Sequence, residues 1–291
     1  NCNFGIEALA RLSKIKLEHI KTSDLSFSIA PKINAAGRLD DMSIGIKCLI
    51  VNNKNEAENY AKQLVAFNEQ RKLVENKMKD EALSILSDCV VEENYTITLY
   101  DIKWHQGVIG ILASRLKEKY YRPTIIFAKD DTGYLKGSGR SIASFHLKDA
   151  LDLVSKKNPE LILTFGGHAM AAGLTIKPEN FKVFCTEFEI IAKEVLSPDD
   201  LKLIIEFDKA IPIKYLNHKT IQIINSQIWG QGFPSPVFFG IFNVVNQKIV
   251  IDKHNKCILK NDYGVYDAII FNFSKELADR IEAIYTIELN T

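Results

Sequence analysis

The chain has 291 residues, of which 46% are hydrophobic and 25% charged, and its formal net charge at pH 7 is +1. This composition is typical of a soluble globular protein, and the length favours two or three domains over one. The near-neutral charge argues against a global field that draws the protein to nucleic acid or membrane, so any polyanion site must come from local clustering. Five widely spaced cysteines without a Cys-x-x-Cys pair argue against a disulfide framework or a zinc module and fit a reducing cytoplasm.

The chain also shows no sign of targeting to a membrane. No apolar run approaches the ~20 residues that a membrane span needs. The sequence begins with neither a Met nor a signal-peptide pattern, which predicts a piece of a longer protein.

Hydrophobic periodicity predicts mainly helices in the first third of the chain. Residues 4–22 are expected to form an amphipathic helix, and a loop around Pro31 is expected to lead to a further helix with Asp40 and Asp41 as N-caps. Residues 54–88 show one long helical pattern without Gly or Pro. Such a polar helix is typical of a rigid connector between two globular parts.

From residue 95 onwards strands and helices alternate, which predicts a sheet with helical cover. The expected strands are 96–100, 123–128, 134–138, 161–165 and 174–176, and the expected helices are 107–120, 148–155 and 178–196. A turn at residues 197–200 marks a domain boundary. Beyond it, the expected elements of a small all-β barrel are a strand at 201–207, a helix at 216–228 and β-rich segments at 236–245, 247–252, 256–260 and 265–273.

The first candidate site is the segment INAAGR at residues 33–38, which includes Asn34. Its small residues let a ligand approach the backbone N–H groups, and the N-terminus of the following helix favours an anion. Arg38 adds a bidentate phosphate donor in a chain that uses Lys far more often than Arg. The alternative is that the small residues permit tight packing and that Arg38 pairs with Asp40 or Asp41.

The second candidate is KGSGRS at residues 136–141. Lys136, Ser138, Arg140 and Ser141 are a dense set of phosphate donors at the end of a predicted strand. A β-turn is the alternative, because Gly-Ser-Gly is common turn chemistry, but a turn has no need of an arginine. Residues 103–148 carry nine basic side chains against three acidic ones, which is the local clustering that the whole-chain charge conceals.

The third candidate is GGHAMAAG at residues 166–173, between two apolar segments. Gly166 and Gly167 expose their N–H groups, and His168 directly follows them, where it can bond a phosphate or sugar oxygen. The alternative is a structural histidine in a tightly packed turn.

The fourth candidate is WHQGVIG at residues 104–110, where His105 lies near the start of a predicted helix. Packing explains the apolar residues of this motif, so a binding role rests on His105 alone. No zincin, Walker A or Gly-x-Ser-x-Gly pattern occurs, and no complete metal site is visible.

Taken in order, these four motifs and WGQGFPSPVF at residues 229–238 resemble the RecJ family of bacterial single-strand-specific DNA exonucleases, which are DHH/DHHA1 phosphoesterases. The resemblance implies an α/β DHHA1 domain with a mixed sheet and helices, and a C-terminal all-β OB-like barrel. A long connecting helix is expected to join them to a helical remnant of a DHH lobe. The implied boundaries are 1–52 for the remnant, 53–90 for the connecting helix, 91–196 for DHHA1 and 197–291 for an OB domain that ends early.

By this resemblance the chain is the substrate-binding half of a 5′–3′ exonuclease of single-stranded DNA that acts in DNA repair and recombination. Phosphodiester hydrolysis would use two Mn²⁺ or Mg²⁺ ions held in the rest of the DHH lobe, because no Asp-His-His motif occurs here, so this chain alone is expected to be catalytically incomplete. The implied partners are single-stranded DNA, a single-strand-binding protein and a helicase, in the bacterial cytoplasm and away from membranes. The expected nucleic-acid-binding residues are Asn34, Arg38, His105, Lys136, Ser138, Arg140, Ser141, Gly166, Gly167 and His168.

Two other readings of the sequence remain open. One is a DHH/DHHA1 phosphodiesterase for short oligoribonucleotides or dinucleotides, against which the predicted barrel weighs. The other is a non-catalytic nucleic-acid-binding module, against which the motif around Arg38 weighs. In the barrel, the aromatic residues available to stack bases are Trp229, Phe233, Phe238, Phe239, Tyr263 and Tyr266, and most of them are expected to belong to its core.

Overall fold

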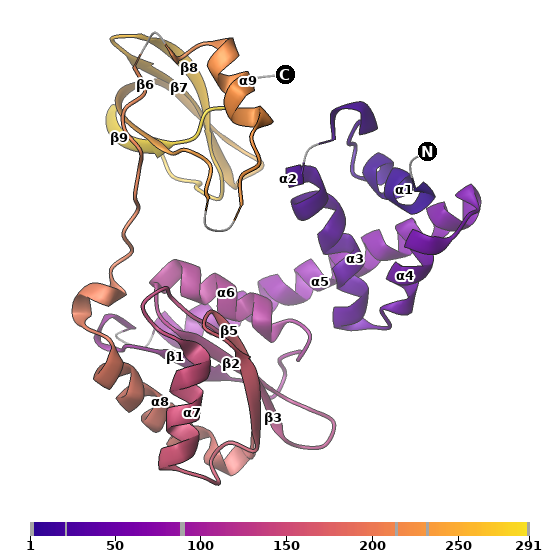
Figure 1. Ribbon diagram of the computed structural model, residues 1–291, viewed down its shortest axis with the longest axis vertical. Coiled ribbons are helices and arrows are strands. Elements are labelled where there is room, and N and C mark those ends of the chain that lie inside the picture. Colours follow the sequence, from indigo (N-terminus) through magenta and orange to yellow (C-terminus); the bar gives the residue numbers. More distant parts are fainter. Residues whose placement is uncertain (1–2, 21, 88–90, 213–214, 231–232, 290–291) are drawn as a thin grey trace. The chain divides into compact units, whose positions relative to one another are not determined.

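The structure is a computed structural model that describes residues 3–20, 22–87, 91–212, 215–230 and 233–289. The chain forms two compact units that divide between Leu203 and Ile204 (Figure 1). The first unit contains the N-terminal helices, the long helix α5 and a five-stranded sheet, and the second contains α9 and a four-stranded sheet. Within the described ranges, no helix has both the length and the apolar character that crossing a membrane requires.

Helix α1 spans Phe4–Leu12 and ends sooner than the predicted helix 4–22. The Ile15 N–H donates to the Ala10 carbonyl at 2.9 Å, and Lys14 adopts a left-handed φ of 58°. This turn stops the helix and changes the direction of the chain. The apolar residues that follow therefore belong to the short elements η1 (Leu17–His19), α2 (Thr22–Asp24) and η2 (Leu25–Ile29).

Helix α3 spans Ala30–Leu39, so the predicted loop around Pro31 is wrong. Pro31 lies in the first turn of the helix, where its missing N–H is not needed and its fixed φ is suitable. The motif at residues 33–38 is consequently helical. Helix α4 (Ser43–Ile50) follows.

Helix α5 spans Lys54–Ser87 and confirms the predicted long helix. Its N-terminal half packs against α1, α3 and α4, and its C-terminal half packs against α6 (Ile109–Tyr120). One buried stripe runs along the whole helix and consists of Ala57, Ala61, Leu64, Asn68, Glu75, Met78, Ala82 and Leu86. The stripe is apolar at both ends and polar in the middle.

The first unit contains a mixed five-stranded sheet, as predicted. Its strands, in spatial order, are β1 (Ile97–Tyr100), β2 (Thr124–Lys129), β3 (Leu135–Arg140), β5 (Ala171–Ile176) and β4 (Thr164–His168). The β1–β2 pair is parallel and the other pairs are antiparallel. The predicted strand 161–165 is shifted towards its C-terminal end, because Leu161 and Ile162 are buried in the core before the strand begins.

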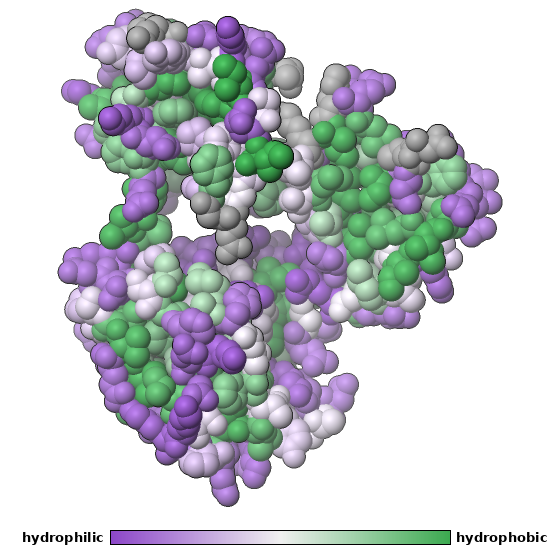
Figure 2. All heavy atoms as spheres, viewed as in Figure 1, coloured by the Kyte–Doolittle hydropathy of each residue, from purple (hydrophilic) through white to green (hydrophobic). Residues whose placement is uncertain are grey.

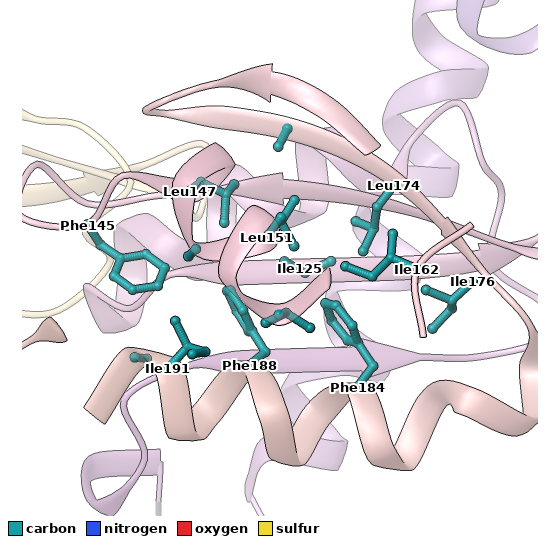
Figure 3. Close-up of a cluster of buried hydrophobic side chains, with 14 of the residues drawn as sticks. Ile125, Phe145, Leu147, Leu151, Ile162, Leu174, Ile176, Phe184, Phe188 and Ile191 are labelled. Carbon is teal, nitrogen blue, oxygen red and sulfur yellow. The ribbon is translucent and has the colours of Figure 1, made fainter. Parts of the chain in front are cut away.

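Helices α7 (Leu147–Lys157) and α8 (Phe181–Val195) cover one face of this sheet. Figure 3 shows Phe184, Phe188 and Ile191 of α8 directed towards the side chains of α7 and the sheet. The short elements η3 (Val91–Glu93), η4 (Pro178–Asn180) and η5 (Pro198–Leu201) lie outside these helices. The predicted strand 201–207 is wrong, because η5 ends at Leu201 and residues 202–207 belong to no strand.

The glycines of the KGSGRS motif face this packed core. An added Cβ at Gly137 would lie 2.6 Å from side-chain atoms of Phe127 and Leu174, and one at Gly139 would lie 2.7 Å from Leu147. Packing therefore explains both glycines.

The opposite face of the sheet is only partly covered. Helix α6 and the C-terminal half of α5 pack over β1 and β2, where Ile126 and Ala128 join their apolar side chains. On β4 and β5 the same face is exposed at Gly166 and Gly173. The exposed face of β4 and β5 thus forms an open floor next to the part of the sheet that α5 and α6 cover.

The second unit is built on an antiparallel sheet in the order β8 (Gly264–Ile270), β7 (His254–Asn261), β6 (Phe238–Val250) and β9 (Arg280–Tyr285), with helix α9 (His218–Ser226) before it. The two predicted segments 236–245 and 247–252 are one long strand with an irregularity between Val244 and Asn246. Among the described residues the sheet is open, with β8 and β9 as its edges, so the predicted closure into a barrel is not seen.

Candidate nucleic-acid interface

Strand register brings five of the ten predicted binding residues to the open face of the first sheet. Residues directly opposite one another on neighbouring strands point to the same face. Three rows therefore cross β3, β5 and β4 on this face: Lys136, Thr175 and Thr164; Ser138, Gly173 and Gly166; and Arg140, Ala171 and His168. The two motifs, about 30 residues apart in sequence, share one surface.

The middle row ends in two glycines that packing does not require. An added Cβ at Gly166 would meet no atom within 4 Å, and one at Gly173 would meet only the Gly137 carbonyl oxygen, at 3.9 Å. Both residues are exposed. The floor beside Ser138 is therefore bare backbone, which a flat or bulky ligand can approach closely.

Gly167 has a different explanation. Its φ is 146°, and an added Cβ would lie 2.3 Å from the Ala171 carbonyl oxygen and 2.5 Å from the Cα of Ala172. The backbone of the β4–β5 hairpin therefore requires glycine here whether or not a ligand binds.

Arg140 ends β3 beside the first turn of α6. Its Nη1 donates to the Gly139 carbonyl at 2.7 Å and to Ser138 Oγ at 3.4 Å. An added Cβ at Gly110 would lie 2.8 Å from Ser138 Oγ and 3.2 Å from Arg140 Nη2. Gly110, which the sequence analysis did not select, thus gives these two side chains their room. The sequence feature that could have indicated this role is the second glycine of the WHQGVIG motif.

Arg38 lies in the last turn of α3 and is half-buried. Its Nη1 donates to the Gly107 carbonyl at 3.1 Å, and an added Cβ at Gly107 would lie 1.9 Å from the Arg38 carbonyl oxygen. The end of α3 therefore packs directly on the turn before α6. Residues 37–40 and 105–107 line a pocket of about 360 Å³ at this contact.

The helical conformation corrects the prediction for residues 33–38. Their N–H groups lie within α3 rather than in a loop at the start of a helix, so they do not form the expected anion cradle. Asn34 is exposed and lies one turn before Arg38, on the same side of the helix. Neither Asp40 nor Asp41 forms an ion pair with Arg38 in the described structure. Asp41 instead accepts hydrogen bonds from the N–H and hydroxyl of Ser43, at 2.9 and 2.6 Å.

Arg38 and Arg140 both lie beside the start of α6, Arg38 at Gly107 and Arg140 at Gly110. Burial lowers the pKa of Arg140, and the positive charge of Arg38 lowers it further. Burial also lowers the pKa of Arg38, followed by the positive charge of Arg71. Both guanidiniums stay charged near neutral pH. Like charges held together in partly buried positions form a site that an anion would stabilise.

The remaining predicted donors are Lys136, at the other end of β3 from Arg140, and the two histidines His105 and His168. Lys136 Nζ donates to Thr175 Oγ1 at 3.0 Å and lies 3.8 Å from Asp130. The Nδ1 atoms of the exposed His105 and His168 accept from the N–H groups two residues ahead, at 3.1 and 3.3 Å respectively. In the neutral rings this leaves Nε2 as the hydrogen-bond donor.

Ser141 does not belong to this surface. It is 1% exposed, and its hydroxyl donates to the Phe145 carbonyl at 2.7 Å. Its side chain stabilises the turn after β3, so the prediction that it contacts a ligand is wrong.

The residues present do not fit a divalent metal ion. The described ranges contain no group of three or more His, Cys, Asp or Glu side chains that could hold one. Mn²⁺ and Mg²⁺ prefer oxygen ligands grouped around one point, whereas this surface presents guanidiniums, an ammonium and bare backbone. Its chemistry suits an anion.

In the second unit most of the predicted stacking residues pack against other aromatic rings, and they differ in how exposed they are. Trp229 stacks on Phe233 at 5.1 Å, and Tyr266 packs edge-on against Phe242 at 6.1 Å. The other rings of the unit pair as well, Phe238 with Tyr285 and Phe239 with Phe207. Tyr263 is 60% exposed, and Phe233, although stacked on Trp229, is 65% exposed, so these two are available to a ligand. Gln231 and Gly232 of the motif at 229–238 lie outside the described residues.

Comparison with known proteins gives matches along the chain. Residues 92–194 match the family model of the DHHA1 domain, and residues 207–291 match that of the RecJ OB domain. The single-stranded-DNA-specific exonuclease RecJ of Haemophilus influenzae is 40% identical over 303 residues, which cover all of this chain and 53% of that protein. The protein of the same description from Escherichia coli K12 is 37% identical and covers 99% of this chain and 52% of its own length.

Solved structures agree with these matches. The crystal structure of RecJ from Thermus thermophilus in complex with Mg²⁺ superposes with a TM-score of 0.80 at 25% identity. The match covers 99% of this chain and 44% of that one. The chain spans about half the length of the curated relatives it matches.

Proposed function

This chain belongs to the RecJ family, and on that basis we propose that it is the substrate-binding half of a single-stranded-DNA-specific exonuclease that hydrolyses phosphodiester bonds from the 5′ end. The full-length protein is proposed to act in DNA repair and recombination, with a single-strand-binding protein and a helicase as partners. The hydrolytic metal centre, with Mn²⁺ or Mg²⁺, is assigned to residues other than those described, because these offer no suitable ligand set.

The observation that carries the proposal is the pairing of Arg38 with Arg140 beside a bare glycine floor. Each guanidinium donates one hydrogen bond to a backbone carbonyl, and its other N–H groups can donate to an anion. A backbone phosphate between them would relieve their mutual repulsion and could bond both in a fixed geometry. Gly166 and Gly173 then leave space for the attached sugar and base.

This arrangement supports binding and positioning rather than bond cleavage. The arginines neutralise the phosphate that they hold, and the Nε2 atoms of His105 and His168 can donate to phosphate or sugar oxygens. Fixing the strand in one register brings the scissile bond to a defined place, which is a large part of catalysis for phosphoryl transfer.

The same proposal assigns residues 1–52 to the end of a DHH lobe, 53–90 to a connecting helix, 91–196 to DHHA1 and 197–291 to the OB domain. Large apolar side chains of the N-terminal helices support the first assignment, since Phe27 is 82% exposed and Ile50 is 68% exposed. Figure 2 shows broad hydrophobic areas over these helices. Such a surface is typical of a face that packs against another part of a protein.

The match to the RecJ OB domain favours this function over a phosphodiesterase for short oligoribonucleotides or dinucleotides. In the proposed role the second unit follows the strand beyond the first binding face, with Tyr263 and Phe233 as the exposed stacking residues.

The test is binding of a fluorescent, 5′-phosphorylated single-stranded oligodeoxynucleotide, measured by anisotropy over a range of salt concentrations. Arg140→Ala should weaken binding about tenfold or more, because it removes a charge-assisted phosphate contact. The control is Lys182→Ala, which removes one positive charge from the exposed side of α8, on the other face of the sheet. Equal affinities of the wild type and Arg140→Ala would remove this face from the binding site.

A further inference from the structure

The buried stripe of α5 contains an ion pair where an apolar pair would pack. Leu64 and Met78, on either side, belong to two apolar cores. Between them, Arg71 and Glu75 are one turn apart, and their side chains are only 12% and 9% exposed. Replacing such a buried pair with apolar residues of similar size is often neutral or stabilising, so stability alone does not explain it.

The carboxylate of Glu75 holds two arginines in place. Its Oε2 accepts from Arg71 Nη1 at 2.7 Å, and its Oε1 accepts from Arg115 Nε of α6 at 3.1 Å. Arg71 Nη2 also donates to the buried Asn68 at 3.1 Å. The Arg71 guanidinium is therefore fixed on two sides, although its buried Nε has no hydrogen-bond partner.

The charge held in this way lies beside the proposed interface. Helix α3, whose last turn carries Arg38, packs against α5, and Glu75 of α5 bonds Arg115 of α6, the helix whose first turn borders Arg140. Besides burial, the positive charge of Arg71 lowers the pKa of Arg38, and the negative charge of Glu75 raises it. Arg38 in turn is the charge that acts on Arg140. Arg38, Arg71 and Arg140 thus lie on three elements, α3, α5 and β3, that each pack against α6 or the turn before it.

We propose that Glu75 is a positioning residue of this interface: through Arg71 it holds a third guanidinium beside Arg38 and Arg140, where it contributes to binding of a DNA phosphate. The proposal rests on the proposed function of this face. Glu75 itself is buried and is not expected to touch the DNA.

Whether Glu75→Gln weakens or tightens DNA binding distinguishes a positioning role of Glu75 from an effect of its charge alone. The substitution makes this region more positive by one charge, and charge alone would tighten DNA binding. A positioning role predicts the reverse: Arg71 loses its ionic acceptor, its guanidinium leaves the fixed position, and binding weakens about tenfold at moderate salt. A plot of log affinity against log salt concentration should also become less steep by about one, because one fewer phosphate contact releases counterions.

Glu118→Gln is the matched control. Glu118 pairs with Arg115 at 3.5 Å from the exposed side of α6, so its replacement adds the same charge without releasing Arg71. Its affinity should equal or exceed that of the wild type. A second variant, Arg71→Lys, keeps the charge but loses the fork that bonds Asn68 and Glu75 together, and it should bind about threefold more weakly.

A fold control keeps the result interpretable if Glu75→Gln unfolds. The double variant Arg71→Met with Glu75→Met replaces the pair by apolar side chains and is expected to stay folded in urea titrations. It should still bind DNA weakly, and wild-type affinity in this folded variant would show that the pair is only structural and overturn the inference. So would a folded Glu75→Gln variant that binds as tightly as the wild type. If the wild type does not bind, or Arg140→Ala binds equally well, the proposed function fails as well.

Discussion

Gly166 and Gly167 are adjacent in β4 but are glycines for different reasons. The backbone conformation and close contacts of the hairpin require Gly167, whereas an alanine methyl at Gly166 would project into open space. Steric packing thus accounts for one residue and leaves the other to be explained by what lies above the sheet. Access of a ligand to the floor between β3 and β4 is the explanation that fits the proposed interface.

Replacing each glycine by alanine separates these two explanations. Gly166→Ala should change the free energy of unfolding by no more than about 0.5 kcal/mol but weaken binding of single-stranded DNA. Gly167→Ala should cost about 2 kcal/mol or more, because it forces a side chain into a strained conformation and a close contact. Urea unfolding followed by circular dichroism and anisotropy with the labelled oligonucleotide give the two quantities. Wild-type DNA affinity in Gly166→Ala would show that the floor is not contacted.

At the scale of elements, the β2–β3 hairpin places Lys136 at the edge of the interface. The turn is organised by Asp130, whose Oδ1 accepts from the Thr132 hydroxyl at 2.7 Å and from the Tyr134 N–H at 2.9 Å. Gly133, with a φ of 91°, completes the turn. These hydrogen bonds, that of the Thr132 hydroxyl first, hold the pKa of the Asp130 carboxyl below its ordinary value.

The direction of this shift predicts how the hairpin responds to acid. A carboxyl whose pKa is lower in the folded state than in the unfolded state stabilises the fold above the ordinary aspartate pKa, and that contribution is lost as the pH falls through the lowered value. The hairpin should therefore keep its geometry at neutral pH and loosen only below about pH 4. An NMR titration of the Asp130 carboxyl carbon tests this, and Thr132→Ala should raise the midpoint. An unchanged midpoint in that variant would contradict the role of the hydroxyl.

Helix periodicity predicted the long elements well, because their buried faces are nearly continuous. Helix α5 is the clearest case, with Ala57, Leu64, Met78 and Leu86 on one stripe. Errors arose where small residues serve packing rather than turns. The Ala-Ala-Gly segment was expected to form a loop but lies inside α3, where Ala35 and Ala36 are buried.

One strand was missed despite a clear pattern. Residues 280–285 (RIEAIY) alternate between exposed and partly buried positions, with Ile281 and Tyr285 packed on the core of the second unit. Alternation of this kind is typical of a strand with one solvated face.

The candidate site could be predicted only in part from the sequence. Arg38 and Arg140 stood out as rare arginines among small residues, and the alternation of Lys136, Ser138 and Arg140 follows from a strand. The contact between Arg38 and Gly107 joins residues 69 positions apart, which no local pattern specifies. No sequence motif indicates the proposed role of Glu75, since that role depends on the packing of α5 against α3 and α6.

At the scale of the whole molecule, the proposed binding of a long strand is expected to involve the second unit as well as the face of the first. The second unit offers exposed rings, and Tyr263→Ala should weaken binding of a long oligonucleotide by about 1 kcal/mol or more without changing stability, because base stacking on an aromatic ring is worth that much. Tyr266→Ala is the contrasting variant: this ring packs against Phe242 in the core, so its loss should lower the unfolding free energy by about 2 kcal/mol. The prediction fails if Tyr263→Ala binds normally while the protein remains folded.

The proposed separation of binding from hydrolysis also concerns the molecule as a whole. Because the net charge is only +1, long-range attraction to DNA is weak, and affinity should come from the local cluster around Arg38 and Arg140. Binding of single-stranded DNA by this chain should therefore fall steeply with added salt and stay the same when EDTA removes divalent metal.

Hydrolysis should behave in the opposite way, because the described residues contain no ligand set for a metal ion. The chain is expected to release no nucleotides from a labelled strand even with Mn²⁺, whereas the full-length protein should degrade the strand and stop when EDTA is added. Gel analysis of the labelled strand with both proteins measures this. Metal-dependent turnover by the chain alone would contradict the assignment of the metal centre to residues other than those described, and binding that disappears with EDTA would contradict an interface built on arginines.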